Sequence, residues 1–162
     1  MGTFATSVQR YIRDRMLETH PSMDWKTEYS IAGTPVDIFG EDTSSLYLME
    51  LEWRRADPAD NAAKLFRHLH TGNIEAANVV VFQMFTEYYD LSRGGVSTKR
   101  KNAEFVGKLA AESLDGVAYE PMEFGIEPPK QGSEWPPSWE ATADEVVDRV
   151  SEKLRQQDSS DR

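Results

Sequence analysis

Residues 46–53, which read Leu-Tyr-Leu-Met-Glu-Leu-Glu-Trp, decide the fold of this 162-residue chain. Successive side chains of a β-strand point to opposite faces of the sheet, so Tyr47, Met49, Leu51 and Trp53 share one apolar face. The opposite face carries two leucines and then Glu50 and Glu52. A strand this apolar belongs inside a sheet, where an unpartnered carboxylate is costly. The two glutamates therefore predict a cationic partner at this end of the strand.

The preceding strand supplies a third acid. Residues 36–39 read Val-Asp-Ile-Phe, and strands that a short turn joins are usually neighbours in the sheet. Asp37 can therefore lie about 5 Å across from the Glu50–Glu52 pair. Three converging carboxylates favour a hard, oxygen-seeking cation, Mg²⁺ or Mn²⁺. Ion pairs with Arg54 or Arg55 are the alternative explanation of one or both glutamates.

The flanking patterns predict an α/β protein. Residues 25–31 alternate as a half-exposed strand and complete an antiparallel meander with the two strands above. Residues 78–85 are almost continuously apolar, which is typical of a central parallel strand. The expected helices cover residues 7–18 with Ser7 as the cap, a segment starting at Asp57-Pro58, and a segment from Ser97 or Thr98 to about residue 113.

The C-terminal part is expected to differ in character. Residues 117–124 form a last strand, in which Pro121 favours an edge position. Residues 126–139 are rich in Pro, Gly and Trp and predict an extended arm on the domain surface. Thr142, with Glu145 three residues later, has the pattern of a capping box before a C-terminal amphipathic helix. We therefore divide the chain into a core over residues 1–125 and an arm with a helix over residues 126–162.

The element order and the acids together resemble the PD-(D/E)xK nucleases. The matching stretch is Pro35-Val36-Asp37-Ile38 followed by Leu48-Met49-Glu50-Leu51-Glu52-Trp53, and the likeness covers about residues 8–90. This resemblance implies the restriction endonuclease-like fold, an αβββαβ core with a central mixed sheet flanked by helices. It also implies metal-dependent phosphodiester hydrolysis of DNA.

The resemblance also implies roles for individual residues. Asp37 and Glu50 would bind the metal together with the Leu51 carbonyl oxygen. Glu52 stands where the family usually has lysine, although some restriction endonucleases have a similar Glu-x-Glu. It would position or deprotonate the attacking water, or hold a second metal.

Two further positions follow from the resemblance. Glu18 matches a first-helix glutamate that joins the metal ligands in several family members, and a solvated helix residue is the alternative. For the missing lysine, Lys26 on the polar face of the first strand is preferred over Lys64, which lies opposite the apolar face of its helix.

The charge distribution bears on the partner. The formal net charge is -10, and such a surface repels nucleic acid unless a local basic patch overrides it. The concentrated basic run is Lys99-Arg100-Lys101, at a helix start whose backbone N–H groups favour phosphate. A solvated helix start is the alternative. The acidic balance also suits a high-salt cytoplasm, where screening makes such a surface tolerable.

Composition excludes several classes of site. The chain has no cysteine, which removes disulfides, thiolate zinc sites and cysteine nucleophiles. No apolar run approaches the roughly 20 residues that span a bilayer, so we expect a cytoplasmic protein without a membrane partner. The sequence is compatible with both a monomer and a homodimer.

Three readings of the function remain. The first two are a DNA nuclease and a catalytically inactive nuclease-fold binding or assembly module. A sheet stabilised by buried ion pairs, with an unrelated role, is the third reading.

Overall fold

A five-stranded mixed sheet forms the centre of the molecule in the computed structural model, which describes residues 2–31, 33–72, 74, 76–160 and 162. The strands lie in chain order, the first three antiparallel and the last two parallel to the third. Their bounds are β1 (Asp24–Ile31), β2 (Thr34–Glu41), β3 (Ser45–Glu52), β4 (Asn78–Thr86) and β5 (Val117–Phe124).

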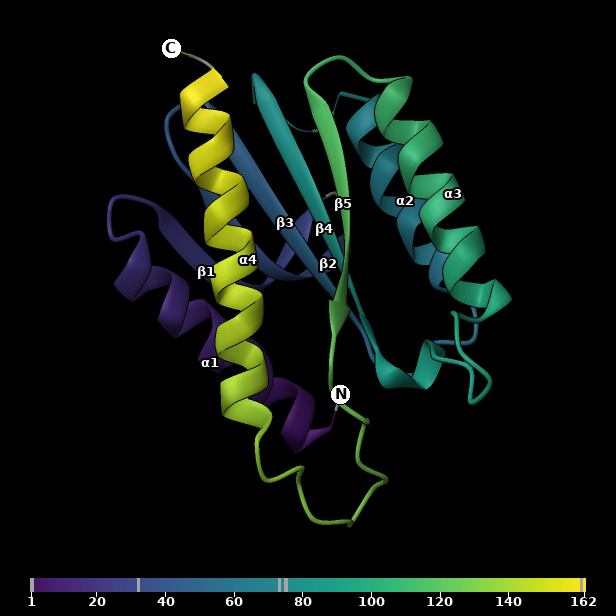
Figure 1. The fold of residues 1–162 in the computed structure, drawn as a ribbon. Helices are drawn as coiled ribbons and strands as arrows, with labels where there is room; N and C mark the ends of the chain where they lie inside the picture. The colour runs from purple at the N-terminus through teal and green to yellow at the C-terminus, as the bar shows by residue number, and fades with distance from the viewer. Residues whose placement is uncertain (1, 32, 73, 75, 161) are drawn as a thin grey trace.

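Two pairs of helices cover the two faces of this sheet (Figure 1). Helices α1 (Thr3–Thr19) and α4 (Trp139–Ser160) pack on one face, and α2 (Pro58–His70) and α3 (Thr98–Glu112) pack on the other. A short 3₁₀ helix, Glu87–Tyr89, follows β4. The alternation of β3 divides the core as expected. Tyr47, Met49 and Leu51 join the cluster under α1 and α4, whereas Leu46 and Leu48 join the cluster under α2 and α3.

The expected architecture is confirmed. The order helix, antiparallel meander, helix and parallel strand appears as predicted, with helices on both faces of a mixed sheet. This arrangement is consistent with the restriction endonuclease-like fold. Pro121 lies in β5, which is an edge strand, as the missing N–H of proline predicted. Within the described residues, no helix combines the length and the apolar character needed to cross a membrane.

Two predicted helix starts are wrong by several residues. Helix α1 begins at Thr3, and the Ser7 hydroxyl donates to the Thr3 carbonyl oxygen at 2.9 Å inside the helix. Helix α4 begins at Trp139, and the Thr142 hydroxyl likewise donates to the Ser138 carbonyl oxygen at 3.2 Å. Serine and threonine hydroxyls inside a helix can also donate to the carbonyl oxygen four residues earlier. Local capping patterns alone therefore misplaced both starts.

Aromatic packing explains why both helices start early. The Phe4 ring lies 5.1 Å from the Trp135 ring and 5.8 Å from the Trp139 ring, measured between centroids. These contacts join the first turn of α1 to the arm and to the first turn of α4. The C-terminal segment thereby contributes to the same apolar cluster as the sheet, through Ala143, Val146, Val147, Val150 and Leu154.

Gly40 gives a test of this packing. It lies opposite Trp25 in the β1–β2 pair, and a Cβ atom built there would approach the Trp25 ring to within 2.3 Å. We expect Gly40→Ala to lower the free energy of unfolding by about 1–3 kcal/mol, as overpacking does. Urea unfolding checks this expectation. Gly125→Ala is the control, because its Cβ would meet Thr142 Cγ2 at an ordinary 4.0 Å. Equal stability of the two variants would contradict the packing.

Candidate active site

The sheet opens between β2 and β3, and Asp37 lies at the opening. The β2–β3 pairing runs from Glu41–Leu46 to Ile38–Met49 and stops there. Beyond it, the Leu51 backbone N–H donates to Asp37 Oδ2 at 2.7 Å. A side-chain carboxylate therefore accepts a β3 backbone N–H at the point where the strand pairing ends. This geometry brings Asp37 beside Glu50, as its place in the neighbouring strand predicted.

The pairing of β2 with β1 is also interrupted at Asp37. The β1–β2 pairing skips the pair Glu28–Asp37, although the pairs before and after it keep one register. Among the described residues, the non-glycine residue with a positive φ is Glu28, whose φ is 53°. Such a backbone conformation costs on the order of 1–3 kcal/mol and tends to occur at functional positions.

Glu50 is buried and Asp37 is half-buried, and their carboxyl groups interact with each other. Gln9 Nε2 donates to Asp37 Oδ1 at 2.9 Å. Burial raises the pKa of Asp37, although the Leu51 N–H opposes the shift. Burial raises the pKa of Glu50 well above its usual value, and the charges of Asp37 and Glu52 raise it further.

Glu52 is fixed by amide groups. Asn61 Nδ2 and Gln83 Nε2 each donate to Glu52 Oε1 at 2.8 Å, and Arg55 Nε lies 3.4 Å from Oε2. The Tyr119 hydroxyl donates to Gln83 Oε1 at 2.6 Å, so the amino group of Gln83 must face Glu52. The Glu52 side chain is only 1% exposed, and this burial raises its pKa.

Two residues predicted for the site lie elsewhere. Glu18 is a solvent-exposed residue of α1 that pairs with Arg15 at 2.6 Å, and α1 instead reaches the cluster through Gln9. Lys26 Nζ pairs with Asp24 at 3.0 Å, and Lys26 does not line the cleft beside the acids. The structure therefore places neither Glu18 nor Lys26 in the cleft beside Asp37 and Glu50.

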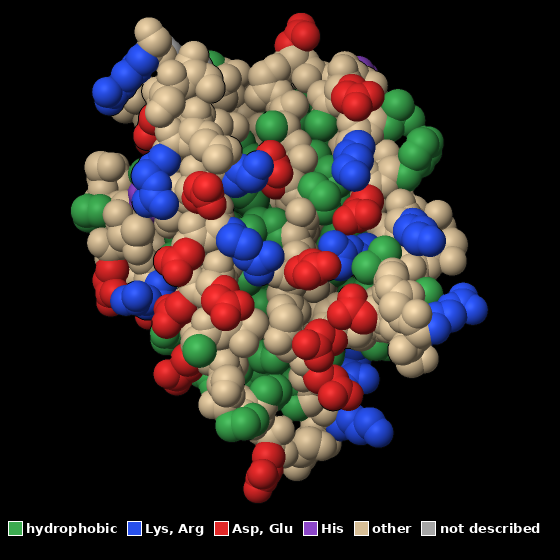
Figure 2. All heavy atoms as spheres, viewed as in Figure 1, with side chains coloured by type: hydrophobic (Ala, Val, Ile, Leu, Met, Phe, Trp, Pro, Cys, Tyr) green, Lys and Arg blue, Asp and Glu red, His purple; other side chains and the backbone are tan. Residues whose placement is uncertain are grey.

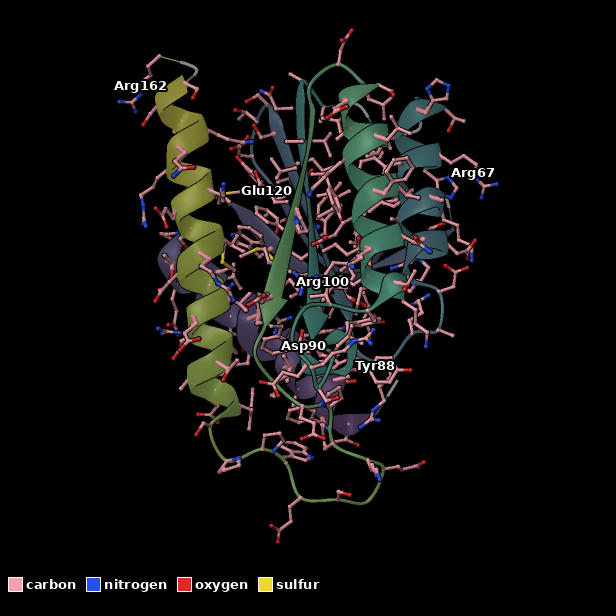
Figure 3. All side chains as sticks on the ribbon, turned by 45° about the vertical axis from the view of Figure 1, so that its right-hand side comes forward. Arg67, Tyr88, Asp90, Arg100, Glu120 and Arg162 are labelled. Carbon is pink, nitrogen blue, oxygen red and sulfur yellow. The ribbon has the colours of Figure 1, made fainter. Side chains whose placement is uncertain are left out.

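The predicted basic patch is divided between the interior and the surface. Arg100 is buried under α3, with Nε 3.3 Å from Glu104 Oε1 and its guanidinium 5.0 Å from the Phe85 ring centroid (Figure 3). Lys99 Nζ donates to the Tyr88 hydroxyl at 3.2 Å, and Lys101 is exposed. The three residues therefore do not form one phosphate-binding surface.

An open cleft of about 840 Å³ lies over the carboxyl pair. The tip of the β1–β2 hairpin forms one wall and α2 the other, with Asp37 and Glu50 between them. Thr34 Oγ1 and His68 Nε2, 2.7 Å apart, join the hairpin to α2. Three cations line the cleft: Arg55, Lys64 and Arg67. Lys64, which the sequence placed toward solvent, is about half exposed and also reaches this cleft.

The carboxyl pair fits a divalent cation in part. Among the described residues, no group of three or more His, Asp or Glu side chains is arranged as a ready metal site. Asp37 and Glu50 nevertheless bring two carboxylates together, whereas Glu52 is held back by Asn61 and Gln83. Mg²⁺ often takes only one or two protein carboxylates and completes its shell with water and substrate oxygens. A cation could therefore be held between Asp37 and Glu50.

Several residues of the cluster escaped the sequence analysis. Gln83 stood out as an amide inside an apolar strand, but a satisfied core residue was the simpler interpretation. Asn61 lies one turn before Leu65 on the inner face of α2, which the helical pattern could have indicated. Gln9 follows Val8 at the margin of the α1 stripe. Nothing in the sequence pointed to Tyr119, which arrives from β5 through the crossover.

Comparisons with known proteins add little. No family model matches the chain, and no curated protein matches it. One solved structure, an EndoMS–dsDNA2 complex, superposes with a TM-score of 0.40 at 17% identity. The superposition covers 75% of this chain and 45% of that chain, so this chain spans less than half of its neighbour's length. A likeness this weak says nothing about what this chain does.

The raised pKa values predict a pH dependence of stability. Without a divalent cation, the folded chain holds protons that the unfolded chain loses above the ordinary values of 3.8 for Asp37 and 4.5 for Glu50. The free energy of unfolding should therefore fall as pH rises through this window. Glu50→Gln should remove part of that fall, because its neutral amide can donate to Asp37.

Urea unfolding in EDTA at about pH 4 and about pH 7.5 measures this dependence. We expect the stability gained by Glu50→Gln to be larger at the higher pH. Glu152→Gln, an exposed position on α4, is the matched control. A gain that is the same at both pH values would show that burial of this charge does not destabilise the protein.

Proposed function

We propose that this protein hydrolyses phosphodiester bonds in DNA with the help of Mg²⁺ or Mn²⁺. The supporting observation is the carboxyl pair of half-buried Asp37 and buried Glu50, which lines a cleft that is open to solvent. Carboxyl groups that only stabilise a sheet would be expected to have cationic partners. Here the hydrogen-bond donors to Asp37 are an amide and a backbone N–H, and burial raises its pKa although these bonds and the charge of Arg55 oppose the shift.

Each residue of the cluster then has a role. Asp37 and Glu50 would hold the cation, which supplies Lewis acidity and an activated water at neutral pH. Gln9 and the Leu51 N–H orient Asp37. Asn61 and Gln83 hold Glu52 close to that pair. Its raised pKa makes it a better acceptor for a proton of the attacking water than an ordinary glutamate.

A catalytically inactive binding module is the second candidate. Glu52 replaces the family lysine and is already paired with Arg55 at 3.4 Å. Acidic and basic side chains are interspersed on the face seen in Figure 2, which offers nucleic acid no continuous basic surface there. A module of this kind would keep the fold and the buried acids without cleaving DNA.

Metal binding and cleavage separate the two functions. We expect the wild-type protein to bind Mn²⁺ in a calorimetric titration and to cleave DNA when Mn²⁺ or Mg²⁺ is present. Asp37→Asn and Glu50→Gln should each weaken Mn²⁺ binding about 100-fold or more, because loss of an outer partner alone costs about 10–100-fold. Both should abolish cleavage while the circular dichroism spectrum stays unchanged.

Asp148→Asn is the matched control, because this acid is exposed on α4 and lies far from the cleft residues in sequence. It should bind Mn²⁺ and cleave as the wild type does. Mn²⁺ binding without cleavage of duplex or single-stranded DNA would favour the inactive module. Cleavage that survives Asp37→Asn would overturn the assigned site.

A further inference from the structure

Three cations line the cleft that contains the acids. Arg55 follows β3, and Lys64 and Arg67 lie on α2, yet all three border the same cavity as Asp37 and Glu50. Arg67 extends from an outer turn of α2 toward solvent (Figure 3). The basic run predicted at Lys99–Lys101 is separate from these residues, and its central arginine is buried. The positive charge nearest to the acids therefore belongs to α2 and the segment before it.

The cations of α2 are arranged in order along the helix, leading away from the acids. Asn61, Lys64 and Arg67 follow one another at three-residue intervals, each a rise of about 4.5 Å along the helix axis. Asn61 contacts Glu50 and Glu52, so it marks the end of α2 nearest to the acids. Lys64 and then Arg67 continue from that point along the same cleft. An elongated ligand that starts at Asp37 and Glu50 would meet Lys64 first and Arg67 next.

The cations keep donors for such a ligand. Arg55 is 53% exposed and contacts Glu52 through Nε, which leaves its terminal N–H groups to the cleft. Lys64 pairs with Asp60 at 2.9 Å, but both side chains are more than half exposed and such surface pairs are weak. No ion pair of Arg67 is found among the residues that the structure describes.

The charge pattern identifies the chemistry of the ligand. The acids facing the cleft, Glu28, Asp37 and Glu50, repel an anion unless a divalent cation lies between them. Cations arranged in succession along a helix fit a chain of regularly placed anions better than one small anion. A phosphodiester backbone that binds together with a divalent cation satisfies both conditions.

We propose that Arg55, Lys64 and Arg67 bind consecutive backbone phosphates of one DNA strand, with Arg55 at the phosphate that reacts. Arg55 then supplies the positive charge that the family's lysine supplies elsewhere. The inference rests on the proposed nuclease function. Because phosphate contacts carry no sequence information, this strand is held without sequence preference.

The salt dependence of DNA binding tests the contacts without relying on cleavage. With Ca²⁺ as the probe cation, log K for a fluorescent oligonucleotide should fall with log salt at a slope of about −2.1 for a single strand or −2.7 for a duplex, as three phosphates require. Lys64→Gln and Arg67→Gln should each make the slope shallower by about 0.7–0.9. Lys101→Gln, on α3, is the matched control and should leave the slope unchanged.

Cleavage rates test the special position of Arg55. In single-turnover reactions, Arg55→Gln should slow cleavage about 10²–10³-fold, as removal of one transition-state donor does. Its Mn²⁺ isotherm should stay within a few-fold of wild type, because Arg55 is not a ligand. Arg55→Lys should restore part of the rate, which a purely structural role for the guanidinium would not predict.

The two proposals fail in different ways. A wild type that binds neither Mn²⁺ nor DNA overturns both. DNA binding with the expected salt slopes but without cleavage leaves the phosphate contacts in place and removes the nuclease. Cleavage that is lost in Asp37→Asn but unchanged in Arg55→Gln, Lys64→Gln and Arg67→Gln keeps the nuclease and overturns the assigned phosphate contacts. A slope that responds to Lys101→Gln alone places DNA on α3 instead.

Discussion

The hydrogen bond from the Leu51 N–H to Asp37 Oδ2, 2.7 Å long, is the constraint on which the cleft depends. Buried backbone donors must be satisfied, and in a continuous sheet a strand carbonyl would satisfy this one. Here a side chain does so, and the β2–β3 pairing ends at Ile38–Met49. The same hydrogen bond therefore accompanies the end of the β2–β3 pairing and places Asp37 beside Glu50.

Amide side chains make most of the hydrogen bonds to the carboxyl cluster of Asp37, Glu50 and Glu52. Gln9, Asn61 and Gln83 satisfy the carboxylate oxygens with hydrogen bonds but add no positive charge. Arg55 is the cation paired with the cluster, at its Glu52 end. Burial therefore keeps the pKa values of Asp37 and Glu50 above their ordinary values. Such an environment lowers the stability of the protein when these acids ionise without a cation beside them.

The strands could be predicted because their patterns are local. The alternation in β3 revealed two buried faces and two acids that needed partners, and the short β2–β3 connection placed Asp37 beside them. Which residues contact these acids depends on how the helices cross the sheet. The pattern of a single segment does not determine that crossing. From α1, Gln9 rather than Glu18 contacts Asp37, and Arg55 and Lys64 rather than Lys26 line the cleft beside the acids. The helix starts at Thr3 and Trp139 depend on contacts among Phe4, Trp135 and Trp139, which lie far apart in sequence.

The acidic surface and the cationic side of the cleft are compatible with one function. A net charge of -10 repels DNA from most of the molecule, so binding requires a place where cations outweigh acids locally. Arg55, Lys64 and Arg67 are concentrated beside the cleft, where a bound divalent cation would also neutralise the charge of Asp37 and Glu50. Repulsion elsewhere would then reduce nonspecific contacts with the rest of the surface. Under the proposed function, the overall charge would restrict where a DNA strand binds, and the few cations near the acids would determine that place.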